Sequence, residues 1–394
     1  MKKYLLISCV VLLFSASLFS QTIYKELPSR FLNTTRDIKI KLPDNYDPES
    51  PIKHPVIIVF DGDYLFEPVL GQVHFQTYFK EMPESIVVGI VQGEERFYDG
   101  YFDELTGMPF ESGKRFYDFV QNELLPYIDN NYNTSPFRVA IGHNMMANFI
   151  NSYLFTDVPV FQAYINISPD YKGTMSNNLA TRLGHLKNDV FYYMATSDKD
   201  VPSLKTKIQE TSRVLKTLDT QKLTLYYDEL KGDTHYTLVT GALSKALDKI
   251  FEIYKPLDEK EINEKVLTYE GTLDEYIVNR YERIEEYFGI VKPITEEEFA
   301  KIVAIAEERD DFESLQNIGK LANKQDPHSS LGTYYLALHA EKIGKNKKAT
   351  KFYESALTLG ETTIIDKEYI KLKLKNLQDL ATDDNERENE DEEN

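Results

Sequence analysis

The sequence predicts an α/β fold: a doubly wound, mostly parallel sheet with helices on both faces, followed by a small all-helical, repeat-like domain. Three observations support this prediction. Short apolar runs alternate with helix-length amphipathic segments over residues 22–258, as they do when strands are buried on both faces. The composition becomes charged and helix-prone after Pro256. At 394 residues, the chain is long enough for one large and one small domain.

Seven runs are expected to form strands, in chain order 38–42, 55–60, 85–91, 137–141, 163–167, 190–194 and 223–227. The first run alternates polar and apolar residues, which is typical of a half-exposed strand. Helical spacing of apolar residues predicts helices at 113–128, 145–155, 204–218 and 238–254. Because these helices fall between strands, a parallel sheet covered on both faces is the expected arrangement.

The C-terminal part is predicted to be helical. Residues 259–293 are charged and helix-prone, and we expect a helical connector there instead of part of a core. Over 294–382, small and aromatic residues recur with the roughly 34-residue period of tetratricopeptide repeats, for example at Leu336, Ala349 and Tyr353. A plain helical bundle has similar spacing and remains an alternative. A tetratricopeptide-like region at 294–382 would offer a surface to a protein partner.

Both ends of the chain have distinctive compositions. Two lysines precede an apolar run that ends near Phe19, which is the pattern of a secretory signal peptide over residues 1–20. We therefore expect export to the periplasm or the exterior, with no membrane span in the mature chain. Lipidation at Cys9 is less favoured, because most of the apolar run follows that residue. Residues 383–394 hold eight acidic residues and no apolar one, so a disordered acidic tail is expected.

The overall composition argues against several classes of partner. A formal net charge of −19 argues against nucleic acid, which attracts clustered basic residues. The seven histidines are scattered and Cys9 is the only cysteine, so no metal site is predicted. We expect no cofactor.

The turn at residues 142–146 is the most informative motif. An apolar strand runs into Gly142, and a helix pattern begins directly afterwards, which is the context of the Gly-x-Ser-x-Gly nucleophile elbow. Asn144 stands where that motif has serine, and Met146 stands where it has the second glycine. Asparagine tolerates the positive φ of such a turn, but its amide nitrogen is a poor nucleophile because its lone pair is delocalised. The turn is therefore built like an elbow without the reactive group.

Two further strand ends supply residues for an oxyanion hole and a general base. Gly62 and Asp63 follow the strand at 55–60, and their backbone N–H groups, with that of Met145, are candidates for an oxyanion hole. His235 lies just before the last helix and is the candidate base.

The acid that orients this base is expected after the strand at 190–194. Asp198 is preferred and Asp200 is the runner-up, because Asp198 is separated by two residues from Val201 and Pro202, where the next helix starts. The order of nucleophile, acid and base is that of Gly-x-Ser-x-Gly hydrolases. Taken singly, each of these residues also fits an ordinary turn, cap or surface position, and only their combined order favours a site.

Residues 22–258, about 60% of the chain, resemble the α/β-hydrolase superfamily. They are most similar to its putative-esterase branch, which includes siderophore esterases and S-formylglutathione hydrolase. Segments 60–64, 141–143 and 232–238 carry this resemblance. It implies ester hydrolysis by members that have a serine at position 144, with Asp198 as acid and His235 as base.

The sequence thus predicts an exported esterase homologue that is inactive or weakly active and binds a small ester-like ligand or a partner. One alternative is an active hydrolase with a non-standard nucleophile. Another is an envelope scaffold that acts through its helical repeats. Ser168 follows a different strand and is not expected to replace the missing serine.

Overall fold

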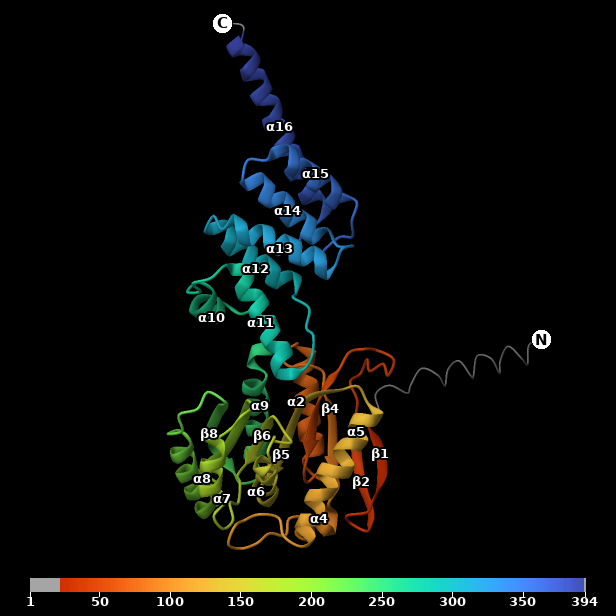
Figure 1. The fold of residues 1–394 in the computed structure, drawn as a ribbon, viewed down its shortest axis with the longest axis vertical. Helices are drawn as coiled ribbons and strands as arrows, with labels where there is room; N and C mark the ends of the chain where they lie inside the picture. Colours follow the sequence, from red (N-terminus) through yellow and green to blue (C-terminus); the bar gives the residue numbers. More distant parts are fainter. Residues whose placement is uncertain (1–21, 393–394) are drawn as a thin grey trace, which may run out of the picture. The chain divides into compact units, whose positions relative to one another are not determined.

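The structure is a computed structural model that describes the backbone of residues 22–392 (Figure 1). The predicted signal peptide and Cys9 lie outside the described residues. The chain divides into two compact units. The first runs to Lys255 and includes Glu286–Ile290; the second comprises Pro256–Glu285 and the residues from Val291 onward.

The first unit is built on an eight-stranded sheet with the order β1-β2-β4-β3-β5-β6-β7-β8. The pairs β1–β2 and β2–β4 are antiparallel, and all other neighbours are parallel. This confirms the predicted mostly parallel sheet, although β1 was not predicted. The strands are β1 (Ile23–Ser29), β2 (Thr34–Lys41), β3 (His54–Val59), β4 (Ile86–Ile90), β5 (Thr134–His143), β6 (Ala163–Ile167), β7 (Val190–Lys199) and β8 (Leu223–Thr234).

Helices cover both faces of this sheet, as predicted. On one face, Val56 and Ile58 join a buried cluster with the apolar side chains of five helices. Ile57 and Val59 point to the opposite face and are also fully buried. The helices of the first cluster are α4 (Ser112–Phe119), α5 (Leu125–Asn131), α6 (Met145–Ile150), α7 (Met175–Leu183) and α8 (Pro202–Leu215).

Helices α2 (Phe66–Tyr78) and α9 (Leu238–Ile250) pack against each other and against strands of the sheet. The predicted helix at 113–128 is found as α4 and α5 joined by a π-turn at Val120–Leu124. The parallel strands have their carboxyl ends at one edge, and the loops that follow them are therefore neighbours.

The second unit is helical throughout its regular structure. α12 packs on α13, and α14 packs on α15, as consecutive helical pairs. A capping box between Thr295 and Glu298 starts α12. The repeat character itself remains a prediction. The helices are α10 (Glu259–Glu261), α11 (Leu273–Phe288, whose end belongs to the first unit), α12 (Glu296–Glu308), α13 (Phe312–Gln325), α14 (Ser330–Lys342), α15 (Asn346–Leu357) and α16 (Lys367–Glu392).

Two expectations for this part of the chain differ from the structure. The segment 259–293, expected to be a connector, buries Val266 and Ile277 completely, so it contributes to a core. The acidic segment from residue 383 was expected to be disordered, but α16 continues through it to Glu392. Glutamate is a good helix former, which allows an acidic segment to extend an existing helix without burying apolar surface.

Candidate active site

The elbow is formed where β5 meets α6. Asn144 has φ 56° and ψ −117°, a backbone conformation that few residues other than glycine adopt. Its N–H donates to the carbonyl of Ile167 at 3.0 Å, which holds the turn against the end of β6. A Cβ on Gly142 would lie 2.6 Å from backbone atoms of Met146, so only glycine permits this close approach of strand and helix. The elbow geometry is thus present with asparagine at its apex.

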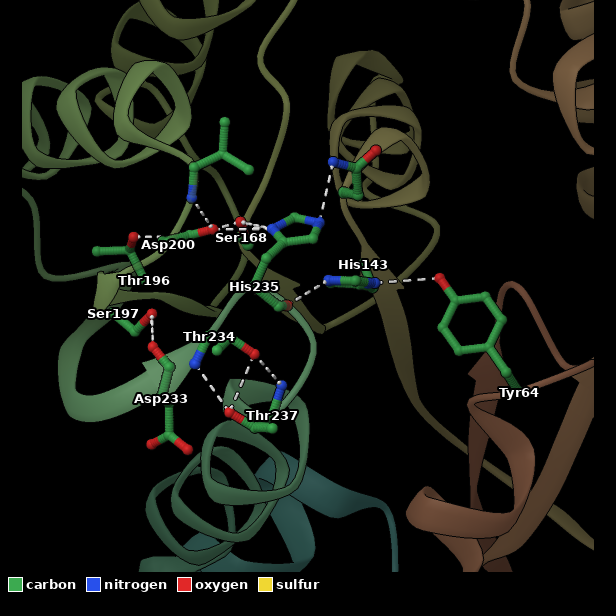
Figure 2. Close-up of polar contacts among 12 residues, drawn as sticks. Tyr64, His143, Ser168, Thr196, Ser197, Asp200, Asp233, Thr234, His235 and Thr237 are labelled. Carbon is green, nitrogen blue, oxygen red and sulfur yellow. Dashed lines mark hydrogen bonds and ion pairs between the residues drawn. The ribbon is translucent and has the colours of Figure 1, made fainter.

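His235 lies opposite the elbow and is oriented by Asp200 (Figure 2). Its Nδ1 lies 2.8 Å from Oδ1 of Asp200. Since a carboxylate only accepts hydrogen bonds, Nδ1 carries a proton, and the tautomer that matches this contact has its lone pair on Nε2. This is the tautomer that a general base requires. The Asp200 side chain is fully buried, and that of His235 is mostly buried.

Asp200 is held by four hydrogen bonds. Besides His235, the donors are the hydroxyls of Thr196 and Ser168, each at 2.7 Å, and the N–H of Val201 at 2.8 Å. Burial raises the pKa of Asp200, but the hydrogen bonds from His235, Thr196, Ser168 and Val201 outweigh burial and hold this pKa below its ordinary value. The carboxylate therefore stays ionised beside the imidazole.

The preference for Asp198 as the acid is corrected by this geometry. Strand β7 extends to Lys199, so Asp198 lies within the strand and is exposed, where it accepts a hydrogen bond from the N–H of Gly232 at 2.7 Å. Asp200 comes after the strand end, directly before the cap of α8. The sequence argument placed the end of the strand too early, and the runner-up is the residue that contacts His235.

Ser168 is a site residue that the sequence reasoning set aside. It follows β6 with φ 44° and is fully buried, and its Oγ lies 3.1 Å from Nδ1 of His235. Its own proton is donated to Asp200, so the Nδ1–H of His235 is shared between both oxygens. Ser168 lies on the Nδ1 side of the ring, away from the basic Nε2. It therefore supports the acid–base pair and is not placed to act as the nucleophile.

Asn144 occupies the side of His235 on which a nucleophile would lie. Its Nδ2 is 3.4 Å from Nε2 of His235. An amide nitrogen carries two protons and a delocalised lone pair, so it donates weakly to the basic nitrogen. The base is thus assembled, and the group that it faces has no activatable hydroxyl.

The three candidate oxyanion-hole N–H groups differ in whether the protein itself occupies them. The N–H of Gly62 donates to the carbonyl of Ile90 at 2.8 Å and is therefore occupied, which corrects its proposed role. Within residues 22–392, no acceptor is found for the N–H groups of Asp63 and Met145. Because β3 and β5 are adjacent and parallel, these two groups lie in neighbouring loops at the same edge of the sheet. They remain available to an oxygen of a ligand.

His143, next to the elbow, fixes the loop that carries His235. Its Nε2 lies 3.1 Å from the carbonyl oxygen of His235, and its Nδ1 lies 3.1 Å from the hydroxyl of Tyr64 (Figure 2). Burial lowers the pKa of His143 to about 4, with the neighbouring His235 adding to the effect, so the ring is neutral near pH 7. The hydroxyl of Tyr64 also contacts Oδ2 of Asp61, in its own loop, at 2.9 Å, and the contact between Tyr64 and His143 joins this loop to the elbow.

Asp61 anchors the loop that bears Asp63. It has φ 54°, is almost fully buried, and pairs with Arg96 through contacts of 2.6 and 3.0 Å. Burial raises the pKa of Asp61, while Arg96 acts in the opposite direction. Its N–H donates to the side chain of Gln92. No motif in the sequence marks Arg96 or Gln92 as site residues, because they reach this loop only through the adjacency of β3 and β4.

Met146, which stands in place of the second glycine of the elbow motif, packs beside the loop that follows β4. It is fully buried, and its sulfur lies 3.6 Å from Nε2 of Gln92. A Cβ on Gly100 would lie 2.6 Å from the methyl carbon of Met145, so the segment around Gly100 packs directly on the elbow. Phe97 and Tyr98 in this segment are largely exposed.

Among the described residues, no cluster of histidine, cysteine and acidic side chains is able to hold a metal ion. Within the same residues, no helix combines the length and apolar character needed to cross a membrane.

Known proteins with related sequences or folds were compared with this chain. The family model described as "Putative esterase" matches residues 29–149, which include the elbow. No curated protein matches. An uncharacterised protein from Capnocytophaga ochracea DSM 7271 is 28% identical with a TM-score of 0.83, over 91% of this chain and 99% of that one.

Two other solved structures share the fold alone. An IroE-like serine hydrolase from Shewanella oneidensis is 20% identical with a TM-score of 0.58, over 76% of this chain and 98% of that one. The BES protein from Bacillus cereus is 24% identical with a TM-score of 0.52, over 59% of this chain and 95% of that one.

Proposed function

We propose that this protein, whose first unit belongs to the esterase branch of the α/β-hydrolase superfamily, does not turn over esters efficiently and uses its retained site to bind a ligand. The observation that carries the proposal is the contact between Nδ2 of Asn144 and Nε2 of His235 at 3.4 Å. The basic nitrogen faces an amide in a site that is otherwise assembled.

The chemical consequence of an amide at this position is large. In a serine esterase, the imidazole takes the hydroxyl proton while oxygen attacks the ester carbon. The Asn144 nitrogen has no comparable lone pair to offer, because that pair is conjugated with the side-chain carbonyl. When a triad nucleophile is removed, the remaining site accelerates hydrolysis only by roughly 10³–10⁴-fold over water. The oxyanion donors and the imidazole then serve binding more than turnover.

The alternative of a non-standard nucleophile finds little support in the geometry. The hydroxyl of Ser168 contacts both members of the acid–base pair, but it lies beside Nδ1 of His235 and donates its proton to Asp200. Its side chain is completely buried. A nucleophile needs to face Nε2 and to be open to the substrate, and Ser168 satisfies neither condition.

The test is a comparison of ester hydrolysis by the full chain, by His235→Ala, by Asn144→Ser and by Asn144→Ser combined with His235→Ala. We expect wild type to be slow and Asn144→Ser to gain activity that depends on His235. Turnover by wild type that is abolished by His235→Ala would contradict the proposal. Asn144→Gln, which keeps the amide, serves as the matched control and is expected to show no gain.

We also propose export, with residues 1–20 acting as a signal peptide. The proposal rests on two N-terminal lysines followed by an apolar run. N-terminal sequencing of the protein from its native cell is expected to find a start near Gln21. A mature protein that still begins at Met1 would contradict export by this route, and a lipidated Cys9 would support the lipoprotein alternative.

A further inference from the structure

The retained site presents more hydrogen-bond donors to a ligand than a serine esterase site does. One N–H of the Asn144 amide faces His235, and for the second no acceptor is found in the described part of the chain. The backbone N–H groups of Asp63 and Met145 are likewise without acceptors among residues 22–392. Tyr64 ties the Asp63 loop to the elbow through its 3.1 Å contact with His143. Three N–H donors are therefore available: that of Asp63 lies in the loop after β3, and those of Asn144 and Met145 lie in the elbow. The contact between Tyr64 and His143 joins this loop to the elbow.

The carboxylates around these donors are already occupied. Asp61 is paired with Arg96, and Asp200 accepts four hydrogen bonds. Asp63 turns its own carboxylate to the N–H groups of Gln92 and Gly93, at 2.8 and 3.1 Å. Asp170, whose N–H donates to the carbonyl of Asn144, is paired with Lys172 at 2.6 Å. Arg96 and Lys172 thus neutralise the charges of Asp61 and Asp170. The carboxylates of Asp63 and Asp200 are stabilised by hydrogen bonds but keep their charges, so the free donors have to outweigh the repulsion from these two groups when an anion binds.

The exchange of serine for asparagine changes which ligand the site prefers. A serine hydroxyl gives its proton to the imidazole and presents lone pairs, which repel an anion and attack an ester. The Asn144 amide gives one proton to the imidazole and presents the other, which attracts an anion. The amide is also one atom longer than a hydroxymethyl group, so it occupies space that an ester carbon would need.

Aromatic rings beside the site favour an apolar substituent on the ligand. The rings of Tyr64 and Tyr236 lie 6.0 and 6.4 Å from the ring of His143. Both remain exposed, with 45% and 76% of their surface accessible. Exposed aromatic side chains next to polar donors are typical of sites that hold the apolar part of a ligand and orient its polar end.

Resting on the proposed function, we infer that the site binds an organic carboxylate that carries an apolar or aromatic group, in preference to its neutral ester or amide. The carboxylate accepts from the N–H groups of Asp63 and Met145 and from the amide of Asn144. The protein then binds the organic carboxylate and does not hydrolyse the corresponding ester.

The experiment is a calorimetric titration of the full chain with benzoate and with benzamide, which has nearly the same shape without the charge. We expect benzoate to bind more tightly than benzamide by more than about tenfold, as charge-assisted hydrogen bonds imply. Asn144→Asp keeps the size of the side chain and adds a negative charge, so it is expected to lose most of the benzoate affinity. Asn33→Asp is the matched control, because Asn33 also has φ 56° but lies in an exposed turn.

Several results would overturn the inference. One is equal affinity for benzoate and benzamide, or no binding of either; another is benzoate binding that is unchanged in Asn144→Asp. If Asn144→Asp fails to fold by circular dichroism, Asn144→Ser replaces it and is expected to bind benzoate more weakly than wild type. These outcomes are separable from the proposed function, since that function fails only through His235-dependent ester turnover by wild type.

Discussion

The side-chain nitrogen Nδ2 of Asn144 lies 3.4 Å from Nε2 of His235, the ring nitrogen that does not contact Asp200. This relationship places an amide where ester hydrolysis needs a hydroxyl. His235 is hydrogen-bonded to Asp200, and the described part of the chain offers no acceptor to the N–H groups of Asp63 and Met145. The site therefore differs from a working serine esterase chiefly at one side chain.

The assignment of the acid is tested by comparing two neighbouring aspartates. In the Asn144→Ser background, Asp200→Asn is expected to lower kcat by about 10⁴-fold, because the amide no longer holds His235 in the productive tautomer. Asp198→Asn is the matched control and is expected to change kcat less than about threefold, since Asp198 accepts from the N–H of Gly232 and, among the described residues, has no hydrogen bond with His235. A large loss in Asp198→Asn with little loss in Asp200→Asn would reverse the assignment.

The supporting role of Ser168 predicts a loss of stability. Ser168→Ala removes a hydrogen bond to the buried carboxylate of Asp200, and we expect the free energy of unfolding to fall by about 1.5–3 kcal/mol. Ser176→Ala is the control, because no hydrogen-bond partner is found for the buried Oγ of Ser176 within residues 22–392, and a change within about 0.5 kcal/mol is expected. Urea unfolding followed by circular dichroism measures both. Equal effects would show that Ser168 contributes no specific support.

His143 predicts a particular dependence of stability on pH. Its folded pKa is about 4, whereas an unfolded histidine has a pKa of about 6.5. Between these values the unfolded chain binds more protons, so the stabilising effect is present above pH 6.5 and is lost as the pH falls towards 4.

His143→Gln removes the pH-dependent contribution of His143 to the free energy of unfolding. The difference in this free energy between wild type and variant is therefore expected to shrink from pH 7 to pH 4.5. Urea unfolding at a series of pH values measures it. His185→Gln serves as the control, because His185 is exposed. A difference that stays constant, or that grows on acidification, would contradict the lowered pKa of His143.

The fold and the elbow could be predicted from the sequence because they depend on local patterns. Continuous apolar runs such as 55–60 indicate strands that are buried on both faces, and Gly142 marks the close contact of β5 with α6. β1 was missed because most of its side chains are exposed and its apolar pattern is weak.

The finer parts of the site depend on where strands end and on which strands are neighbours. The apolar run at 190–194 suggests that the strand ends well before Asp198, and this favours Asp198 as the acid. In the structure β7 extends to Lys199, so the preference is wrong. The sequence cannot show that the N–H of Gly62 is unavailable to a ligand, because its hydrogen bond to the carbonyl of Ile90 arises from the pairing of β3 with β4. Ser168 was set aside because a single serine after a strand forms no motif. It enters the site through the adjacency of β6 and β7.

The central claim is tested most directly by kcat/KM for 4-nitrophenyl butyrate, measured for wild type, Asn144→Ser, and Asn144→Ser with His235→Ala. The account predicts that Asn144→Ser exceeds wild type by at least about a hundredfold, because the base and the oxyanion donors are already in place. The second substitution is expected to abolish this gain. A wild-type rate that equals that of Asn144→Ser and disappears in His235→Ala would contradict the account.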